Sequence, residues 1–195
     1  QFQDAKNNKY EINASWVSNI ADSLGMQNNG LDDNNDNNFG GFGVNQNGNA
    51  LQHAVSGGDI SASASFAQLS LHAEYLSALR SFAIQDLTFN SAAAKPSAMS
   101  FEADYAFTWL NKPATLALGY DQSWQAAALN LPKQSYRIGM NVAWFKNTVF
   151  GLQYSHDVNY SQNEINNSTG NNKPLANGSY NKTRNSVIAQ VGLYF

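Results

Sequence analysis

Apolar and polar residues alternate along most of the chain, and this period of two is typical of β-strands with one apolar and one polar face. In residues 136–144, every second side chain is large and apolar, and Arg, Gly, Asn and Ala lie between them. The same alternation occurs in residues 10–20, 60–66, 69–79, 101–109, 115–121, 150–155 and 185–195. The pattern therefore predicts eight strands.

The apolar positions change phase between Phe66 and Leu69. They fall on even residue numbers before this point and on odd numbers after it. A shift of one residue would turn every following side chain to the opposite face of a continuous strand. We therefore predict a tight turn near residues 66–68 and a strand on each side of it. A bulge within one long strand is the alternative.

The connections between the predicted strands alternate between long and short. Residues 25–56, 83–99 and 158–182 form the long connections. Short connections lie near residues 66–68, 110–113 and 145–147, and residues 130–134 form one of intermediate length. In bacterial outer-membrane barrels, the turns on the periplasmic side are short and the extracellular loops are long. A carboxyl terminus on the periplasmic side would place every long loop outside the cell.

The composition agrees with a membrane barrel. Charged residues make up 13% of the 195 residues, against about 25% in a typical soluble domain. Aromatic residues reach 12%, although the mean hydropathy is −0.43. A soluble β-sandwich, the alternative, would carry more charge on its outward face. The predicted fold is therefore an all-β, antiparallel, up-and-down transmembrane β-barrel, in which apolar residues face lipid and polar residues face inward.

Several classes of protein are excluded by the same sequence. It has no run of about 18 apolar residues for a transmembrane helix, and its net charge of −3 gives no basic surface for nucleic acid. It has no cysteine, and therefore no disulfide or thiolate site. No nucleophile, triad or phosphate-loop motif occurs, so we predict neither an enzyme nor a cofactor. Gln1 begins no signal peptide, so we expect a mature chain or part of a longer one.

Aromatic residues lie at both ends of several apolar stripes. Tryptophan and tyrosine favour the boundary between membrane and water, because their rings are apolar at one end and form hydrogen bonds at the other. The chain also ends on an aromatic residue, Phe195, which we interpret as the signal for the barrel-assembly machinery. The predicted interface girdle consists of Trp16, Trp109, Tyr120, Trp124, Tyr136, Trp144 and Tyr154.

Charged residues on the predicted inner face form a candidate constriction. With a tight turn at residues 110–113, Glu102 and Asp121 are expected to lie roughly opposite each other. We expect Arg80 to reach Glu102 and Arg137 to reach Asp121, with Glu74, His72 and Asp104 one layer lower. These charges either select ions or pair to hold the wall in register. The second role is favoured, because buried charges are nearly always paired.

One long loop carries Asp32, Asp33 and Asp36 among asparagines. A solvated acidic loop is the favoured interpretation, because Asn and Asp are common in turns. Binding of a hard cation such as Ca²⁺ is the alternative, including the divalent ions that bridge lipopolysaccharide. The spacing is not that of a known calcium loop, so we predict no metal site.

Residues 70–157 contain several short segments that resemble the siderophore-porin family typified by the legiobactin receptor. The most specific segments are Ala94-Lys95-Pro96, Ala117-Leu118-Gly119-Tyr120, Ala128-Leu129-Asn130-Leu131-Pro132, and Tyr154 to Tyr160 with His156 and Asp157. The segment from Asn19 to Ser23, outside this range, also fits the resemblance. The resemblance implies an outer-membrane barrel of a Gram-negative bacterium that takes part in siderophore-mediated iron uptake. It assigns no ligand-binding residue.

The resemblance also implies about 16 strands, so residues 1–195 are expected to form either a whole barrel domain or the C-terminal half of a larger one. The function expected from it is uptake of a ferric siderophore or a similar small solute. A nonspecific diffusion porin and a structural barrel subunit of a larger envelope assembly are the alternatives. The expected partners are outer-membrane lipid, lipopolysaccharide, the assembly machinery, the solute, and further barrel strands or envelope proteins.

Overall fold

The structure, a computed structural model, describes residues 2–4, 8–21, 53–84, 86–129, 131–168 and 182–194. Two of the predictions concern residues outside these ranges. They are the acidic loop with Asp32, Asp33 and Asp36, and the assembly signal at Phe195.

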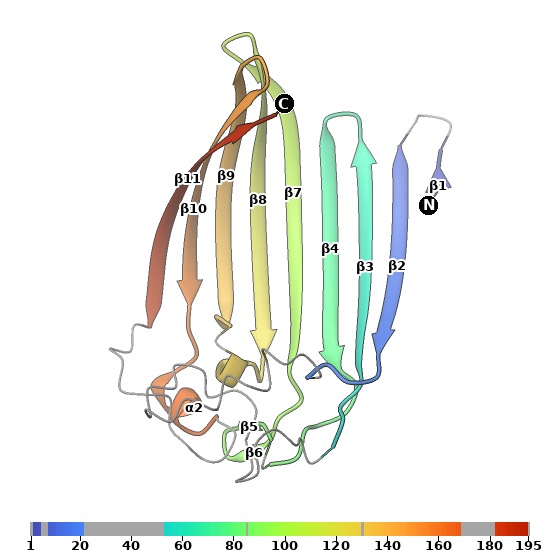
Figure 1. Ribbon diagram of the computed structural model, residues 1–195, viewed down its shortest axis with the longest axis vertical. Helices are drawn as coiled ribbons and strands as arrows, with labels where there is room; N and C mark the ends of the chain where they lie inside the picture. Colours follow the sequence, from blue (N-terminus) through green and yellow to red (C-terminus); the bar gives the residue numbers. More distant parts are fainter. Residues whose placement is uncertain are drawn as a thin grey trace.

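The described chain forms one large antiparallel sheet in which each long strand pairs with the next along the sequence (Figure 1). A two-residue strand, β1 (Phe2–Gln3), extends the sheet at the first long strand. The long strands are β2 (Lys9–Val17), β3 (Gly57–Phe66), β4 (Leu69–Ala78), β7 (Ser97–Trp109), β8 (Lys112–Trp124), β9 (Gln134–Phe145), β10 (Thr148–Val158) and β11 (Thr183–Leu193). The prediction of an all-β, up-and-down sheet with eight strands is confirmed.

The strand predicted at residues 10–20 is too long at its carboxyl end. β2 ends at Val17, and Ile20 packs against buried residues of the connections instead of continuing the apolar stripe. The backbone nitrogen of Ile20 donates a hydrogen bond to the carbonyl oxygen of Val55, which holds this segment against the next connection.

The short connections are turns of two residues. Ala67 and Gln68 join β3 to β4, so the phase change near residue 67 is a turn and not a bulge. Leu110 and Asn111, which join β7 to β8, have φ angles of 48° and 61°. Positive φ at both central residues is the conformation whose twist matches that of paired strands. The prediction of a tight turn near residues 66–68 is confirmed.

The described parts of the long connections gather at the opposite end of the sheet from the short turns (Figure 1). They contain a small hairpin of β5 (Thr88–Phe89) and β6 (Ala92–Ala93), a 3₁₀ turn η1 (Ala127–Leu129), and a short helix α2 (Gln162–Asn166). The predicted alternation of long and short connections is therefore confirmed for the described strands. Neither helical segment of the described chain is long and apolar enough to span a membrane.

The two faces of the sheet differ sharply in chemistry. Strand register places Phe101, Leu118 and Ile138 on one face, next to apolar residues of the neighbouring strands. These three side chains are 43%, 49% and 47% exposed. Serine, glycine and charged residues occupy the opposite face. The sheet thus exposes apolar side chains to its surroundings, where a water-soluble protein would bury them.

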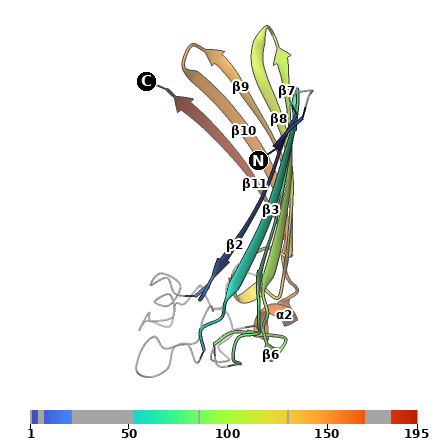
Figure 2. The ribbon, with the colours of Figure 1, turned by 90° about the vertical axis from the view of Figure 1, so that its right-hand side faces the viewer.

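The sheet twists and curls (Figure 2). Its polar face is the concave one, because the polar side chains of this face line a hollow. A hollow of about 530 Å³ lies against this face, and its lining extends from Glu74 on β4 to Arg184 on β11. Among the described residues, β11 pairs with β10 alone, and β2 pairs with β3 and β1. The described sheet is therefore open, and β11 does not pair with β2 to close a small eight-stranded barrel.

The densest apolar packing lies among the long connections and not within the sheet. Val55, from the connection before β3, is almost fully buried there together with Phe82 and Leu87, from the connection between β4 and β7. Ala21, Ala78, Ala94 and Ala128 complete this cluster. The connections consequently form a packed end to the sheet instead of separate loops.

Candidate functional site

A row of polar side chains crosses six neighbouring strands at one level of the concave face. The strand register defines the row as Glu74, Ser100, Asp121, Ser135, Asp157 and Arg184. A serine thus stands between each pair of carboxylates. Such donors stabilise ionised oxygens and keep neighbouring like charges apart.

The hydrogen bonds within this row are short. The hydroxyl of Ser100 donates to Oδ1 of Asp121 at 2.8 Å, and that of Ser135 donates to Oδ1 of Asp157 at 2.7 Å. Arg184 donates to Oδ2 of Asp157 from Nη2 at 2.9 Å and from Nε at 3.2 Å. Asp157 is therefore held by a hydroxyl on one side and a guanidinium on the other.

Arg137 occupies the next row and bridges two strands. Its Nη2 lies 3.0 Å from Oδ1 of Asp121 and 3.9 Å from Oε2 of Glu102. The guanidinium lies over Gly119, where an added Cβ would be only 2.7 Å from Nε of Arg137. Gly119 is thus the position that lets this side chain lie flat across the wall and meet both carboxylates.

The predicted contact between Arg137 and Asp121 is confirmed, but the predicted register of Glu102 is wrong. Glu102 lies opposite Gly119, and Asp121 lies opposite Ser100. The turn contains two residues instead of the four that we expected, and this moves each partner along β8 by two positions. Glu102 and Asp121 are therefore diagonal neighbours with Arg137 between them.

Three other predicted wall residues lie elsewhere than expected. Arg80 follows the end of β4 and donates a hydrogen bond to the carbonyl of Ala54, so the predicted contact with Glu102 is wrong. Glu74 lies level with Asp121, and His72 lies level with Glu102. Their predicted place one layer lower is therefore wrong as well.

His72 and Glu74 approach each other at 3.9 Å between Nε2 and Oε2. Asp104 lies one row nearer the short turns than Glu102, so its lower position is confirmed. In the described part of the chain, no cluster of histidine and carboxylate side chains is arranged to hold a metal ion.

The pair of Asp157 and Arg184 was not among the contacts predicted from the sequence. Asp157 has the same parity as Gln153 and Ser155, and this parity identifies it as a residue of the polar face. Its partner could not be found in the same way. A long connection separates β10 from β11, and alternation alone does not determine the register across such a loop.

The concave face carries a clear excess of negative charge. Within the described strands, it has seven carboxylates and three cationic side chains. The carboxylates are Glu11, Asp59, Glu74, Glu102, Asp104, Asp121 and Asp157, and the cations are Lys9, Arg137 and Arg184. A curved surface of one predominant sign attracts and concentrates ions of the opposite sign.

The aromatic residues predicted to form a girdle all lie on the apolar face. Tyr120 and Tyr136 are in contact near the long connections, with ring centroids 5.2 Å apart. Trp109 and Trp144 form a pair at the opposite end of the sheet, at 5.8 Å. Trp16 and Trp124 lie on the same face at the end of the strands next to the connections. Tyr154 lies on this face near the middle of the sheet, opposite Ile138. Their contact with a membrane interface stays a prediction.

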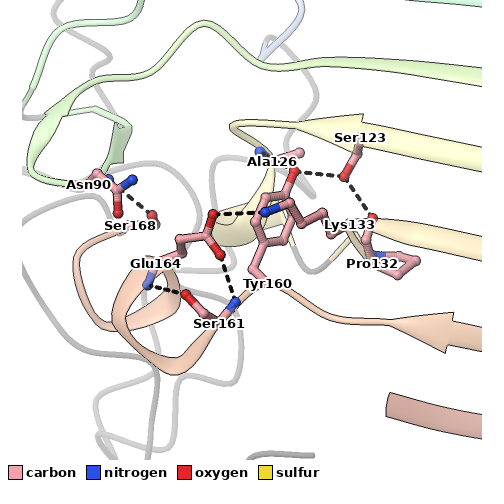
Figure 3. Close-up of polar contacts among 9 residues, drawn as sticks. All are labelled: Asn90, Ser123, Ala126, Pro132, Lys133, Tyr160, Ser161, Glu164 and Ser168. Carbon is pink, nitrogen blue, oxygen red and sulfur yellow. Dashed lines mark hydrogen bonds and ion pairs between the residues drawn. The ribbon is translucent and has the colours of Figure 1, made fainter. Parts of the chain in front are cut away.

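Tyr160 anchors the connections at the end of the concave face (Figure 3). Its hydroxyl lies 2.9 Å from Oγ of Ser123 and accepts a hydrogen bond from the backbone nitrogen of Ala126 at 3.3 Å. Ser123 in turn donates to the main-chain carbonyl of Pro132 at 2.7 Å. Burial raises the pKa of the Tyr160 phenol above its ordinary value of 10, so this group stays neutral.

Helix α2 is fixed to the same region through Glu164 (Figure 3). Ser161 and Glu164 form a capping box, in which the Ser161 nitrogen donates to Oε2 of Glu164 at 2.7 Å. Lys133 donates to Oε1 at 3.1 Å. Burial alone would raise the pKa of the Glu164 carboxyl, but hydrogen bonds from Ser161 and the charge of Lys133 outweigh it and hold this pKa below its ordinary 4.5.

Replacing Glu164 by glutamine is therefore expected to destabilise the protein at neutral pH and to have less effect in acid. A carboxyl whose pKa is lower in the folded state stabilises that state above pH 4.5. This contribution is lost as the pH falls through the folded-state pKa. Urea unfolding of both forms between pH 7 and 3 measures the difference. Gln162→Ala in the same helix is the control, and its effect on the free energy of unfolding should be independent of pH. If the effect of Glu164→Gln is also independent of pH, the lowered pKa of Glu164 is contradicted.

The chain is similar to curated proteins of two bacterial species. The chain is similar over its whole length to a UPF0422 protein of Coxiella burnetii (strain RSA 493 / Nine Mile phase I), with 38% identity over 197 residues, or 39% of that protein. UPF0422 proteins of Legionella pneumophila strains Philadelphia 1 and Lens are 35% identical over 190 residues, which are 95% of this chain and 35% of each relative. The chain thus spans less than two fifths of these curated relatives. No protein-family model and no solved structure matches it.

Proposed function

We propose that the sheet is part of the wall of an outer-membrane β-barrel that surrounds a hydrophilic passage for small solutes. The observation that carries the proposal is the separation of the two faces. Apolar side chains are exposed across all eight long strands on one face, and a negatively charged hollow of about 530 Å³ lies on the other. Lipid satisfies the first face and water the second.

The strand lengths support this proposal. A tilted strand needs about 9–11 residues to cross the hydrocarbon layer. The long strands range from 9 residues in β2 to 13 in β7 and β8. All of them are long enough, and the longest leave residues at each end for the membrane interface.

The open edges favour a wide barrel over a narrow one. Eight strands alone would enclose a space filled by side chains, whereas about sixteen surround an aqueous channel. Unpaired backbone groups are costly in lipid, so each edge needs a partner strand. The segment shared with this chain is 39% of the Coxiella burnetii relative and 35% of the Legionella pneumophila relatives, so each relative has length enough for further strands. We propose that such strands complete the wall.

The charge of the concave face predicts a passage selective for cations. Reversal potentials of the full chain in a planar bilayer, measured under a gradient of KCl, should indicate cation preference. Arg137→Ala should strengthen this preference, because it removes one of the few cations of the wall. Lys112→Ala removes a cation at the edge of the apolar face, and should leave selectivity unchanged. If Arg137→Ala also leaves it unchanged, Arg137 serves only to hold the wall in register.

A ferric siderophore is the solute that the family resemblance suggests, and the long connections would face the cell exterior in that arrangement. Uptake of iron-loaded siderophore in a deletion strain, restored by the full-length protein, tests this solute. Swelling of liposomes in sugar solutions tests nonspecific diffusion in parallel. Swelling without siderophore uptake would indicate a general diffusion porin with the same wall.

A further inference from the structure

A second hollow, of about 260 Å³, lies at the end of the sheet where the long connections gather. It adjoins the larger hollow, because Leu76, Ala98 and Leu131 line both. Its lining is otherwise mainly apolar, with Val17 from β2 and Leu129 from η1 among the contributors. A concave and largely apolar space with few polar groups is the usual form of a site for a small molecule.

Gly57 gives this pocket part of its shape. A Cβ atom at Gly57 would lie 2.1 Å from Cγ2 of Ile20, so the Ile20 side chain rests directly on the glycine backbone. Ile20 also packs against the buried cluster of the connections. The pocket wall is therefore part of the packed end of the sheet, and its shape is already formed without a ligand.

One carboxylate, that of Asp59, lines this apolar space. Its Oδ1 accepts a hydrogen bond from the hydroxyl of Ser15 at 3.2 Å. Its Oδ2 is buried and has no hydrogen-bond partner in the described part of the chain. None of the ion pairs among the described residues includes Asp59.

An ionised oxygen that is buried without a partner destabilises the protein, unless a cation or a donor approaches it. Leu76 lies opposite Asp59 in the strand register, so an apolar surface begins directly beside the carboxylate. A ligand complementary to both the carboxylate and the apolar surface has a positively charged hydrogen-bond donor at one end and an apolar body. A bare metal ion would leave the apolar lining unused, and a single carboxylate is a poor ligand set for it.

We infer that this pocket binds a small organic cation with an apolar body, such as an alkylammonium ion. The ammonium group pairs with the carboxylate of Asp59, and the alkyl chain lies against Val17, Leu76 and Leu129. The inference goes beyond the proposed passage, because the described residues form the pocket whether or not further strands complete the wall. If the bilayer measurement shows no passage, the inferred binding of an organic cation is therefore unaffected. If no cation binds to the pocket, the proposed passage for solutes is unaffected in turn.

Calorimetric titration of the full chain, folded in detergent micelles, tests the inference with three probes of equal chain length. They are hexylammonium, hexanol and hexanoate, and titration of protein-free micelles gives the blank. Hexylammonium should bind most tightly and hexanoate should not bind. Asp59→Asn, which keeps the shape and removes the charge, should weaken hexylammonium by about ten- to a hundredfold and leave hexanol unchanged. Glu11→Gln removes a carboxylate of the same face outside the pocket and should change nothing.

A second variant tests the position of the site independently of Asp59. Ala98→Leu should fill the space between the two hollows and weaken hexylammonium and hexanol alike. The inference is overturned if hexylammonium and hexanol bind wild-type protein equally. It is also overturned if Asp59→Asn binds hexylammonium as the wild type does, or if Ala98→Leu has no effect on either probe.

Discussion

Replacing Tyr160 by alanine is expected to lower the free energy of unfolding by about 3–5 kcal/mol, the usual cost of removing a buried aromatic ring. The Tyr160 side chain is 2% exposed, and its ring centroid lies 5.7 Å from that of Phe89 in an edge-on contact. The substitution also leaves Ser123 and Ala126 without their partner in a dry environment. Urea unfolding of the full chain in lipid vesicles, followed by tryptophan fluorescence, measures the change.

Two conservative variants separate the parts of this effect. Tyr160→Phe keeps the ring and removes the hydroxyl, so it should cost about 1–3 kcal/mol for the buried groups left unpaired. Tyr194→Phe removes a hydroxyl from a tyrosine that is 63% exposed and should have almost no effect. A loss below about 1 kcal/mol for Tyr160→Ala would mean that the connections are not held together through this residue.

The number of strands and the chemistry of their faces could be predicted from the sequence, because both depend on local alternation. Side chains of a strand point to opposite faces with a period of two. The parity of Leu118 and Ile138 is therefore enough to assign them to one face, and the phase change at Ala67 is enough to locate a turn. No knowledge of the neighbouring strand is needed for either conclusion.

The register between strands could be predicted less well, because it depends on the geometry of each turn. The turn at Leu110 and Asn111 is two residues shorter than expected, and this alone changed the residue opposite Glu102. The predicted contact between Arg80 and Glu102 was wrong for a related reason, because the strand that precedes Arg80 ends at Ala78. The parity of a residue number predicts the face of the sheet on which the side chain lies. Predicting its contacts on that face also requires its position along the strand relative to the neighbouring strand.

The packed end of the sheet could not be predicted from periodicity. Phe82 and Leu87 lie in connections without a regular repeat, and they become buried through contacts with segments distant in sequence. The pocket beside Asp59 depends on the same contacts, because Ile20 and Leu129 enter it from two of these connections. A carboxylate in alternating sequence, such as Asp59, carries no local signal that one of its oxygens is buried.

Leu118→Arg is expected to destabilise the protein in a lipid bilayer by about 2–4 kcal/mol, the cost of an arginine on the lipid face near the bilayer midplane. Leu118 is the middle residue of β8 (Lys112–Trp124), and its side chain is 49% exposed on the apolar face. Reversible unfolding in vesicles measures the loss. The same substitution in detergent should cost less, because micelles deform around a charged group more readily than a bilayer does.

The adjacent residue on the same strand provides the matched control. Ala117 points to the concave face and lies opposite Asp104 in the register, so Ala117→Arg places the charge in water next to a carboxylate. Its cost in the bilayer should fall well below that of Leu118→Arg. Equal losses at the two positions, or a larger loss at Ala117, would mean that lipid does not cover the apolar face. A larger loss at Ala117 would make the concave side the drier one, which its excess of carboxylates makes physically costly.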